Sequence, residues 1–223
     1  MKRFQKFVLG LLVVAAVLPS CKKGDDDPFL SLRSRKGRVA GDWTVDARVK
    51  TETQSNSSSS TSTTTTTTIS GSNWTQTHSN SSDVHTGAVT FTFKFDKDGK
   101  WSSVYELTET DNTGGVTTTS VEHTESSGIW NFLGKIGDAK NKENMSVSTT
   151  SETTKTTFTS TFFPSSTNVT TKTYSENENV EIWKITELKN KEMMVEMTID
   201  NSSVTNSGST SKTSGSTTMT LKQ

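Results

Sequence analysis

The chain has 223 residues, enough for one large β domain or two small ones. Only 28% of the residues are hydrophobic, while Ser and Thr together make up about a third, so any core must be narrow and the surface very polar. The 24 basic and 24 acidic residues cancel, and removal of a basic leader would leave the chain about three charges negative. Without a basic surface, nucleic acid is not expected as a partner.

Aromatic residues in alternating segments argue against disorder. The chain has five Trp and ten Phe, and most lie where apolar and polar residues alternate, which is typical of strands with one buried face. Thr also suits a pleated, solvent-facing surface, because its Cβ is branched. The composition therefore predicts an all-β protein with a Thr-rich sheet.

Residues 1–20 have the pattern of a secretory signal peptide. Three basic residues precede an apolar run over 7–18, which is too short to span a bilayer. The run ends in Leu18-Pro19-Ser20-Cys21, which resembles the bacterial lipobox. The resemblance implies cleavage before Cys21, lipidation of Cys21 and membrane anchoring through it. The alternative is a free thiol behind an ordinary signal peptide; either way, a single Cys provides no disulfide framework.

Residues 21–38 are expected to form a tether. The charged run Lys22–Asp27 is typical of a solvated linker, and it is also similar to the export signal of lipoproteins that reach the cell surface of Bacteroidota. We therefore expect an outer-membrane anchor, with the leaflet left open. Pro28–Arg38 is basic, and its periodic stretch is too short to predict a helix. It is therefore expected to be a solvated connector, with contact to lipid phosphate as the alternative.

The folded domain is placed at residues 39–223, and Gly41-Asp42-Trp43 opens its first strand. The tract Thr51–Asp83 follows, and its centre is nearly pure Ser and Thr. Such a tract carries no apolar alternation, so it is expected to be a long flexible loop between two strand ends. Trp74 is expected to re-enter the sheet.

Residues Val89–Leu107 form the clearest folding signal, a β-hairpin. Four apolar residues alternate with polar ones before the turn residues Asp96–Lys100, and a second set resumes on one face afterwards. The expected inward residues are Val89, Phe91, Phe93, Phe95, Trp101, Tyr105 and Leu107.

Further strands and turns are expected in regular order towards the C-terminus. The expected turns and bends lie at 111–115, 126–128, 164–166 and 189–191, and the expected loops at 134–144 and 201–214. The expected strands lie at 116–123, 129–133, 145–163, 169–174, 180–188, 192–200 and 217–221. Eight to ten antiparallel strands in this order favour a meander closed into a barrel, which removes exposed edges.

Four motifs carry a family resemblance, over residues 39–223: Gly41-Asp42-Trp43, the Phe91–Trp101 hairpin, Gly128-Ile129-Trp130, and Glu181–Leu188 with its following strand. This succession resembles the lipocalin-like lipoproteins of Bacteroidota. The resemblance implies an antiparallel lipocalin-like barrel with long Ser/Thr-rich loops, and a Trp at position 43 that closes the bottom of the barrel.

No catalytic constellation stands out, so the chain is not expected to be an enzyme. His78, His85 and His123 would form a metal site with Asp83 or Glu122 only if the strands brought them together. None of their spacings is typical of metal ligands, so isolated surface histidines are expected, with no metal and no cofactor.

The aromatic residues suggest ligand binding rather than catalysis. A small barrel either fills its interior with side chains or leaves a mouth open to an apolar ligand. If a ligand site exists, its wall is expected at Phe91, Phe93, Trp101 and Tyr105. The sequence thus predicts a lipid-anchored cell-envelope binding protein that holds a small hydrophobic ligand. The alternative is a non-catalytic surface or adhesive lipoprotein that acts through its Ser/Thr-rich loops.

Overall fold

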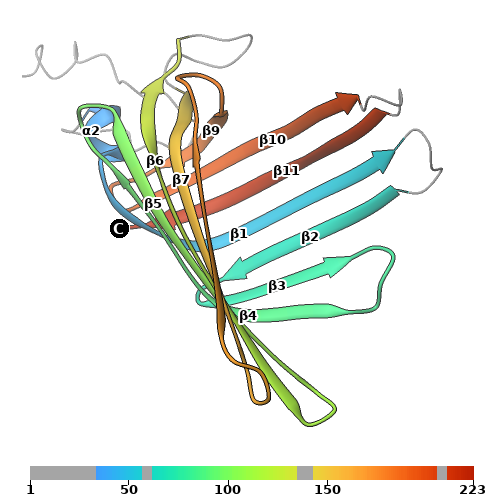
Figure 1. The fold of residues 1–223 in the computed structure, drawn as a ribbon. Helices are drawn as coiled ribbons and strands as arrows, with labels where there is room; N and C mark the ends of the chain where they lie inside the picture. The colour runs from blue at the N-terminus through green and yellow to red at the C-terminus, as the bar shows by residue number, and fades with distance from the viewer. Residues whose placement is uncertain (1–33, 57–61, 135–142, 205–209) are drawn as a thin grey trace, which may run out of the picture.

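The computed structural model describes residues 34–56, 62–134, 143–204 and 210–223, which form one short helix and eleven strands (Figure 1). The elements are α2 (Arg35–Val39), β1 (Gly41–Asn56), β2 (Ser62–Ser70), β3 (Asn73–His78), β4 (Val84–Phe95), β5 (Lys100–Thr113), β6 (Val116–Phe132), β7 (Asn144–Ser160), β8 (Ser166–Thr173), β9 (Val180–Leu188), β10 (Glu192–Val204) and β11 (Thr210–Lys222). Most of the expected loop at 134–144, together with Cys21 and the leader, lies outside the described residues.

Ten of the eleven strands close into an antiparallel barrel. The order is β6-β5-β4-β3-β2-β1-β11-β10-β9-β7, and pairing of β6 with β7 completes the ring, while β8 is an extra strand on β7. Neighbours in the ring are almost always neighbours in sequence, as in a meander. The predicted all-β antiparallel barrel is therefore confirmed.

The barrel is narrower at one end than at the other. Near α2, β1 pairs directly with β4, with Trp43 opposite Phe93, so eight strands make up the ring there. Beyond Thr44 the two strands part, and the β2–β3 hairpin fills the space between them. We call the α2 end of the barrel the closed end, and the part beyond this fork the open half.

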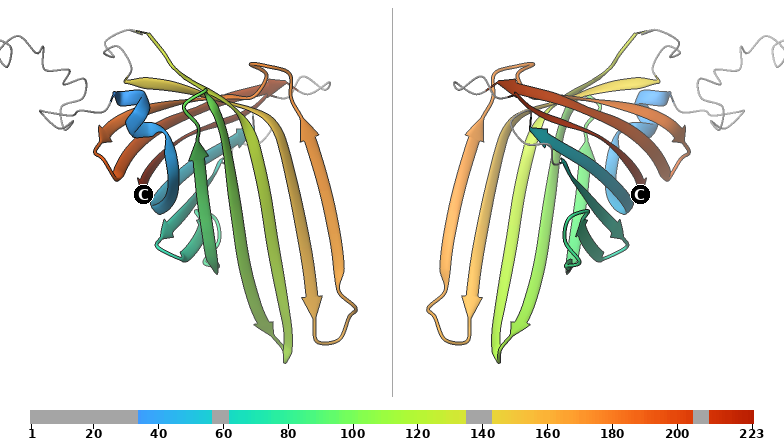
Figure 2. Two further views of the ribbon diagram at one scale, coloured as in Figure 1. Left: turned by 90° about the vertical axis from the view of Figure 1, so that its left-hand side faces the viewer. Right: turned by 90° about the vertical axis from the view of Figure 1, so that its right-hand side faces the viewer.

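The open half also separates on its other side. β9 pairs with β7 only up to the contact of Val180 with Ser148, after which β8 takes its place on the edge of β7. From Met197 onwards β10 pairs only with β11 in the described part of the chain, and β8 only with β7. The two walls therefore diverge away from the closed end (Figures 1 and 2).

Aromatic side chains fill the closed end. The rings pack edge to face, as Trp183 does against Phe93 at 5.2 Å between ring centroids and against Phe95 at 5.9 Å. The largest side chains that are at most 2% exposed are Trp43, Trp130, Trp183, Phe95, Ile69, Met145, Ile185, Leu188, Met193 and Leu221. The indole N–H groups of Trp43, Trp101, Trp130 and Trp183 each donate a hydrogen bond. This end is thus a packed core in which these four indole N–H groups are satisfied.

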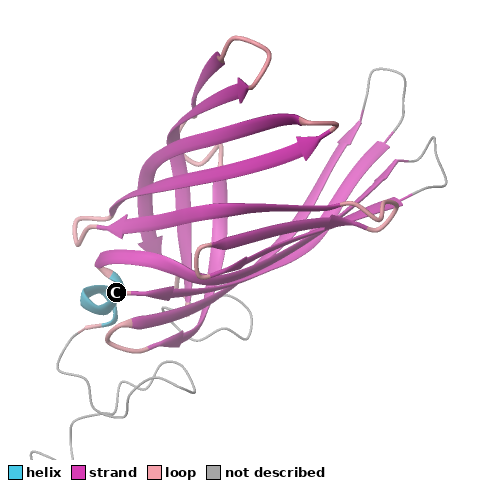
Figure 3. Cartoon of the chain, turned by 90° about the horizontal axis from the view of Figure 1, so that it is seen from below, coloured by secondary structure: helices cyan, strands magenta, loops and turns pink. Residues whose placement is uncertain are grey.

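The helix α2 belongs to the folded domain, contrary to the expected solvated connector. Ser34 caps it by accepting from the Gly37 amide, and Arg35 and Arg38 are each only 5% exposed. Arg38 donates to the carbonyl of Leu188 at the end of β9, and the ammonium of Lys36 lies 5.6 Å from the centroid of the Trp130 ring. The folded domain therefore includes α2, the helix drawn in cyan in Figure 3, and extends N-terminal to the expected start at residue 39.

The Ser/Thr tract expected as a loop instead forms much of β1, β2 and β3. Nine residues of β2 pair with β1, and six pair with β3. Hydroxyls bond across strands here and elsewhere, as between Thr53 and Thr64 at 2.9 Å and between Thr124 and Thr154 at 3.0 Å. The expected loop at 201–214 is likewise shortened, because β10 extends to Val204 and β11 begins at Thr210. These strands consist largely of Thr, and they lack the alternation of apolar and polar residues from which a strand is usually predicted.

The predicted turns are confirmed. The central hairpin reverses at Asp96–Gly99, and β5 turns into β6 through Gly114 and Gly115, whose φ angles of 62° and 81° suit glycine. The turns near 164–166 and 189–191 join β7 to β8 and β9 to β10. The expected bend at 126–128 is a β-bulge, with a register shift between Ser127 and Gly128.

Candidate functional site

A β-bulge in β1 decides which side chains enter the open half. Trp43 and Val45 face the core, but the register with β11 shifts between Val45 and Ala47. The shift reverses the alternation, so Arg48 pairs opposite the inward-facing Met219, and Val49 is 44% exposed on the outside. Simple alternation from Trp43 and Val45 would point Val49 into the barrel. After the bulge, the charged side chain of Arg48 points inward instead.

The interior of the open half contains a cavity of about 490 Å³. Its size lies within the range of small-molecule sites. Its walls come from the inward faces of six strands, β1 to β6. The lining residues are Arg48, Lys50, Glu52, Thr67, Trp74, Gln76, His85, Tyr105, Leu107, Glu109 and Glu122.

Phe91 and Tyr105 lie where the packed core meets this cavity. Their rings pack edge to face at 5.3 Å between centroids, and Phe91 packs on Phe93 below it at 4.6 Å. The guanidinium of Arg48 lies 5.8 Å from the centroid of the Phe91 ring. The floor of the cavity is therefore aromatic, with one cation above it.

Burial perturbs the ionisable groups at this floor. Burial lowers the pKa of Arg48, while Glu181, Tyr105 and Glu52 oppose that shift. The phenol of Tyr105 has its pKa raised to about 12, first by burial and then by the nearby carboxylate of Glu122. Such shifts are typical of groups held in a partly desolvated site.

The four residues predicted to form a ligand wall separate into two pairs. Phe93 and Trp101 are each 6% exposed inside the packed core, where Trp101 donates to the carbonyl of Ser148 at 3.0 Å. Phe91 and Tyr105 are partly exposed, and Tyr105 lines the cavity itself. The polar lining residues, Arg48 above all, were not predicted, because no pattern in the sequence marks the bulge that turns them inward.

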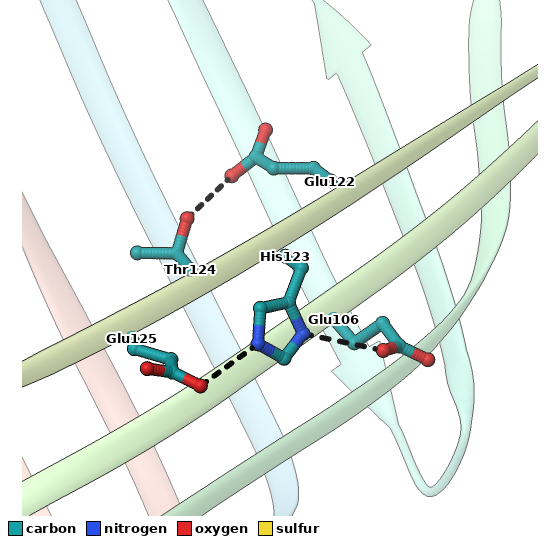
Figure 4. A network of polar contacts seen from close by, with 5 residues as sticks. All are labelled: Glu106, Glu122, His123, Thr124 and Glu125. Carbon is teal, nitrogen blue, oxygen red and sulfur yellow. Dashed lines mark hydrogen bonds and ion pairs between the residues drawn. The ribbon is translucent and has the colours of Figure 1, made fainter. Parts of the chain in front are cut away.

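The three histidines do not converge on one site. The rings of His78 and His85 lie 6.2 Å apart between centroids, on neighbouring strands. His123 lies on the outer face of β6, bonded to Glu106 and Glu125 (Figure 4). Within the described residues no group of three or more His, Cys, Asp or Glu side chains is arranged to hold a metal ion.

The pair of carboxylates around His123 predicts a pH-dependent contribution to stability. The carboxylates of Glu125 and then Glu106 raise the pKa of His123 by accepting hydrogen bonds from its ring, at 3.2 and 3.3 Å, and Lys155 lies directly across on β7. Because the folded-state pKa lies above that of the unfolded chain, the protonated ring stabilises the fold below about pH 6.5. This stabilisation is lost as pH rises through the raised pKa.

The expected size is a few tenths of a kcal/mol, because the His123 side chain is 35% exposed and its charge is screened. Urea unfolding of the wild type and of His123→Gln at about pH 6 and about pH 8 measures it. The wild type should lose more stability between the two values than the variant does. Equal losses would contradict the assignment.

Comparison with known proteins adds no further constraint, since no protein-family model, curated protein or solved structure matches the chain. Among the described residues, no helix has the length and apolar character needed to cross a membrane.

Proposed function

We propose that the chain is a lipid-anchored protein of the cell envelope, related to lipocalin-like lipoproteins, that binds a small amphipathic molecule in the open half of its barrel. The resemblance of Leu18-Pro19-Ser20-Cys21 to the lipobox supports a lipid anchor. The charged run Lys22–Asp27, which is similar to the export signal of Bacteroidota lipoproteins, supports an outer-membrane location. The barrel, closed at one end by a packed core, supports binding at the other end.

The observation that carries this proposal is the cavity above the Phe91–Tyr105 floor. Trp74, Tyr105 and Leu107 offer apolar surface, while charged side chains make up much of the remaining wall. An entirely apolar ligand would desolvate those charges without replacing their contacts with water, which is costly. A molecule with an apolar body and a polar head fits both parts, so the apolar ligand expected from the sequence is refined to an amphipathic one.

Native mass spectrometry of the full chain in lipid nanodiscs tests the proposal. A bound small molecule should appear as a discrete extra mass that organic solvent releases. Thr67→Tyr places a ring inside the cavity and should abolish the extra mass, because Thr67 lines it. Thr68→Tyr is the matched control, since Thr68 is the next residue of β2 and faces outward, opposite the exposed Val49.

A bare polypeptide mass, or an extra mass unaffected by Thr67→Tyr, would contradict binding in the cavity. Such a result would favour the second candidate, a surface protein that contacts macromolecules. The observation behind that candidate is the β7–β8 region, where Phe162 and Phe163 are 70% and 71% exposed. All of β8 is exposed as well, and among the described residues its outer edge is unpaired.

A further inference from the structure

We propose that the head group bound in the cavity is an organic cation, held between Glu109 and Glu122 beside the ring of Tyr105. This inference rests on the proposed function and adds the chemical class of the ligand. It follows from the charges inside the barrel, from the positions of the two carboxylates and from the surfaces next to them.

The charges inside the open half do not balance. Lys50 and Glu52 form an ion pair at 2.9 Å, with 29% and 27% of their side chains exposed. The cavity is lined by two basic side chains, Arg48 and Lys50, and by three acidic ones, Glu52, Glu109 and Glu122. Glu109 and Glu122 remain, and in the described part of the chain neither forms an ion pair. The unmatched charge in the cavity is therefore negative, which favours a cation.

The strand register places these two carboxylates on the same inward face. Glu122 lies directly across from Leu107, and Glu109 is the next inward residue of β5. Diagonal neighbours of this kind are about 7 Å apart at Cβ, which leaves room for an ammonium group between the carboxylates. Within the described residues, Glu122 accepts one long hydrogen bond of 3.4 Å, from Thr124, separate from the His123 group (Figure 4).

The surroundings favour an organic cation over a metal ion. The rings of Tyr105 and Trp74 and the side chain of Leu107 border the same cavity. Aromatic faces attract ammonium groups and accept their alkyl substituents, whereas a divalent metal requires several oxygen ligands. Two carboxylates beside aromatic and aliphatic carbon therefore match a substituted ammonium group on an apolar body.

Three probes with similar aromatic bodies test the inference: benzyltrimethylammonium, phenylacetate and benzyl alcohol. Each is titrated by calorimetry into the full chain in nanodiscs, with empty nanodiscs as the blank. Benzyltrimethylammonium should bind about tenfold or more tightly than either other probe. In the double variant Glu109→Gln/Glu122→Gln its affinity should fall about tenfold, with a smaller loss in each single variant.

The matched control is Glu106→Gln/Glu125→Gln, which removes the same charge from the same two strands but on the outer face beside His123. It should leave the affinity for benzyltrimethylammonium unchanged. Equal binding of the three probes, or an equal loss in the control, would overturn the cation assignment while leaving a binding cavity in place. Absence of binding by all three would overturn the cavity as a small-molecule site as well.

Discussion

Replacing Gly128 with alanine is expected to destabilise the protein by about 3 kcal/mol or more. Gly128 sits at the bulge of β6, where a Cβ atom would overlap the carbonyl oxygen of Ser148 and lie 2.9 Å from the indole nitrogen of Trp101. That oxygen belongs to the backbone of β7 and already accepts the Trp101 hydrogen bond. Relief of the overlap would separate β6 from β7, the pair that closes the barrel.

Urea unfolding followed by tryptophan fluorescence measures this effect. Gly134→Ala is the matched control, because a Cβ atom at Gly134 meets no described residue within 4 Å. The control should change the free energy of unfolding by no more than about 0.5 kcal/mol. Similar stability of the two variants would show that β6 and β7 do not approach each other as closely as described.

Replacing Trp183 with alanine is expected to cost about 3–5 kcal/mol. The side chain is 2% exposed at the centre of the closed end, and its ring packs edge to face on both Phe93 and Phe95. Removal would also take away the indole N–H that Glu181 accepts at 2.9 Å. Trp183→Phe should recover part of the loss, because a smaller ring fills part of the same space.

Thermal and urea unfolding compare these variants with Phe163→Ala, which removes an aromatic ring that is 71% exposed. The surface variant should change stability by less than about 0.5 kcal/mol. An equally large loss at Phe163 would mean that the β7–β8 tip is covered in solution. A negligible loss at Trp183 would contradict the packed closed end.

Much of the closed end could be predicted from the sequence, because its residues repeat with the period of a strand. The Phe91–Phe95 alternation, the turn at Asp96–Gly99 and the bend at Gly128 all produce short-range patterns. Trp43 likewise lies at the closed end and is 1% exposed.

The open half was less predictable, because its strands have no apolar face to recognise. In β2 a run of Thr pairs on both sides, although nothing in its pattern distinguishes inward from outward residues. The bulge between Val45 and Ala47 depends on pairing with β11, about 170 residues away in the chain. Arg48 therefore enters the cavity for a tertiary reason, and the cavity's charges could not be assigned from local spacing.

Hydrogen–deuterium exchange of the full chain can show whether one barrel is divided into a packed end and a hollow half. Backbone amides in the closed end should exchange slowly, in the segments 41–45, 91–95, 183–185 and 219–221, because they pair around the buried aromatic core. Amides of β2 and of the exposed β8 should exchange much faster. Addition of benzyltrimethylammonium should slow exchange in 105–109 and 120–124 without changing the closed end. Uniform protection throughout the barrel, or slower exchange in β2 and β8 than in the closed end, would contradict the division into a packed end and a hollow half.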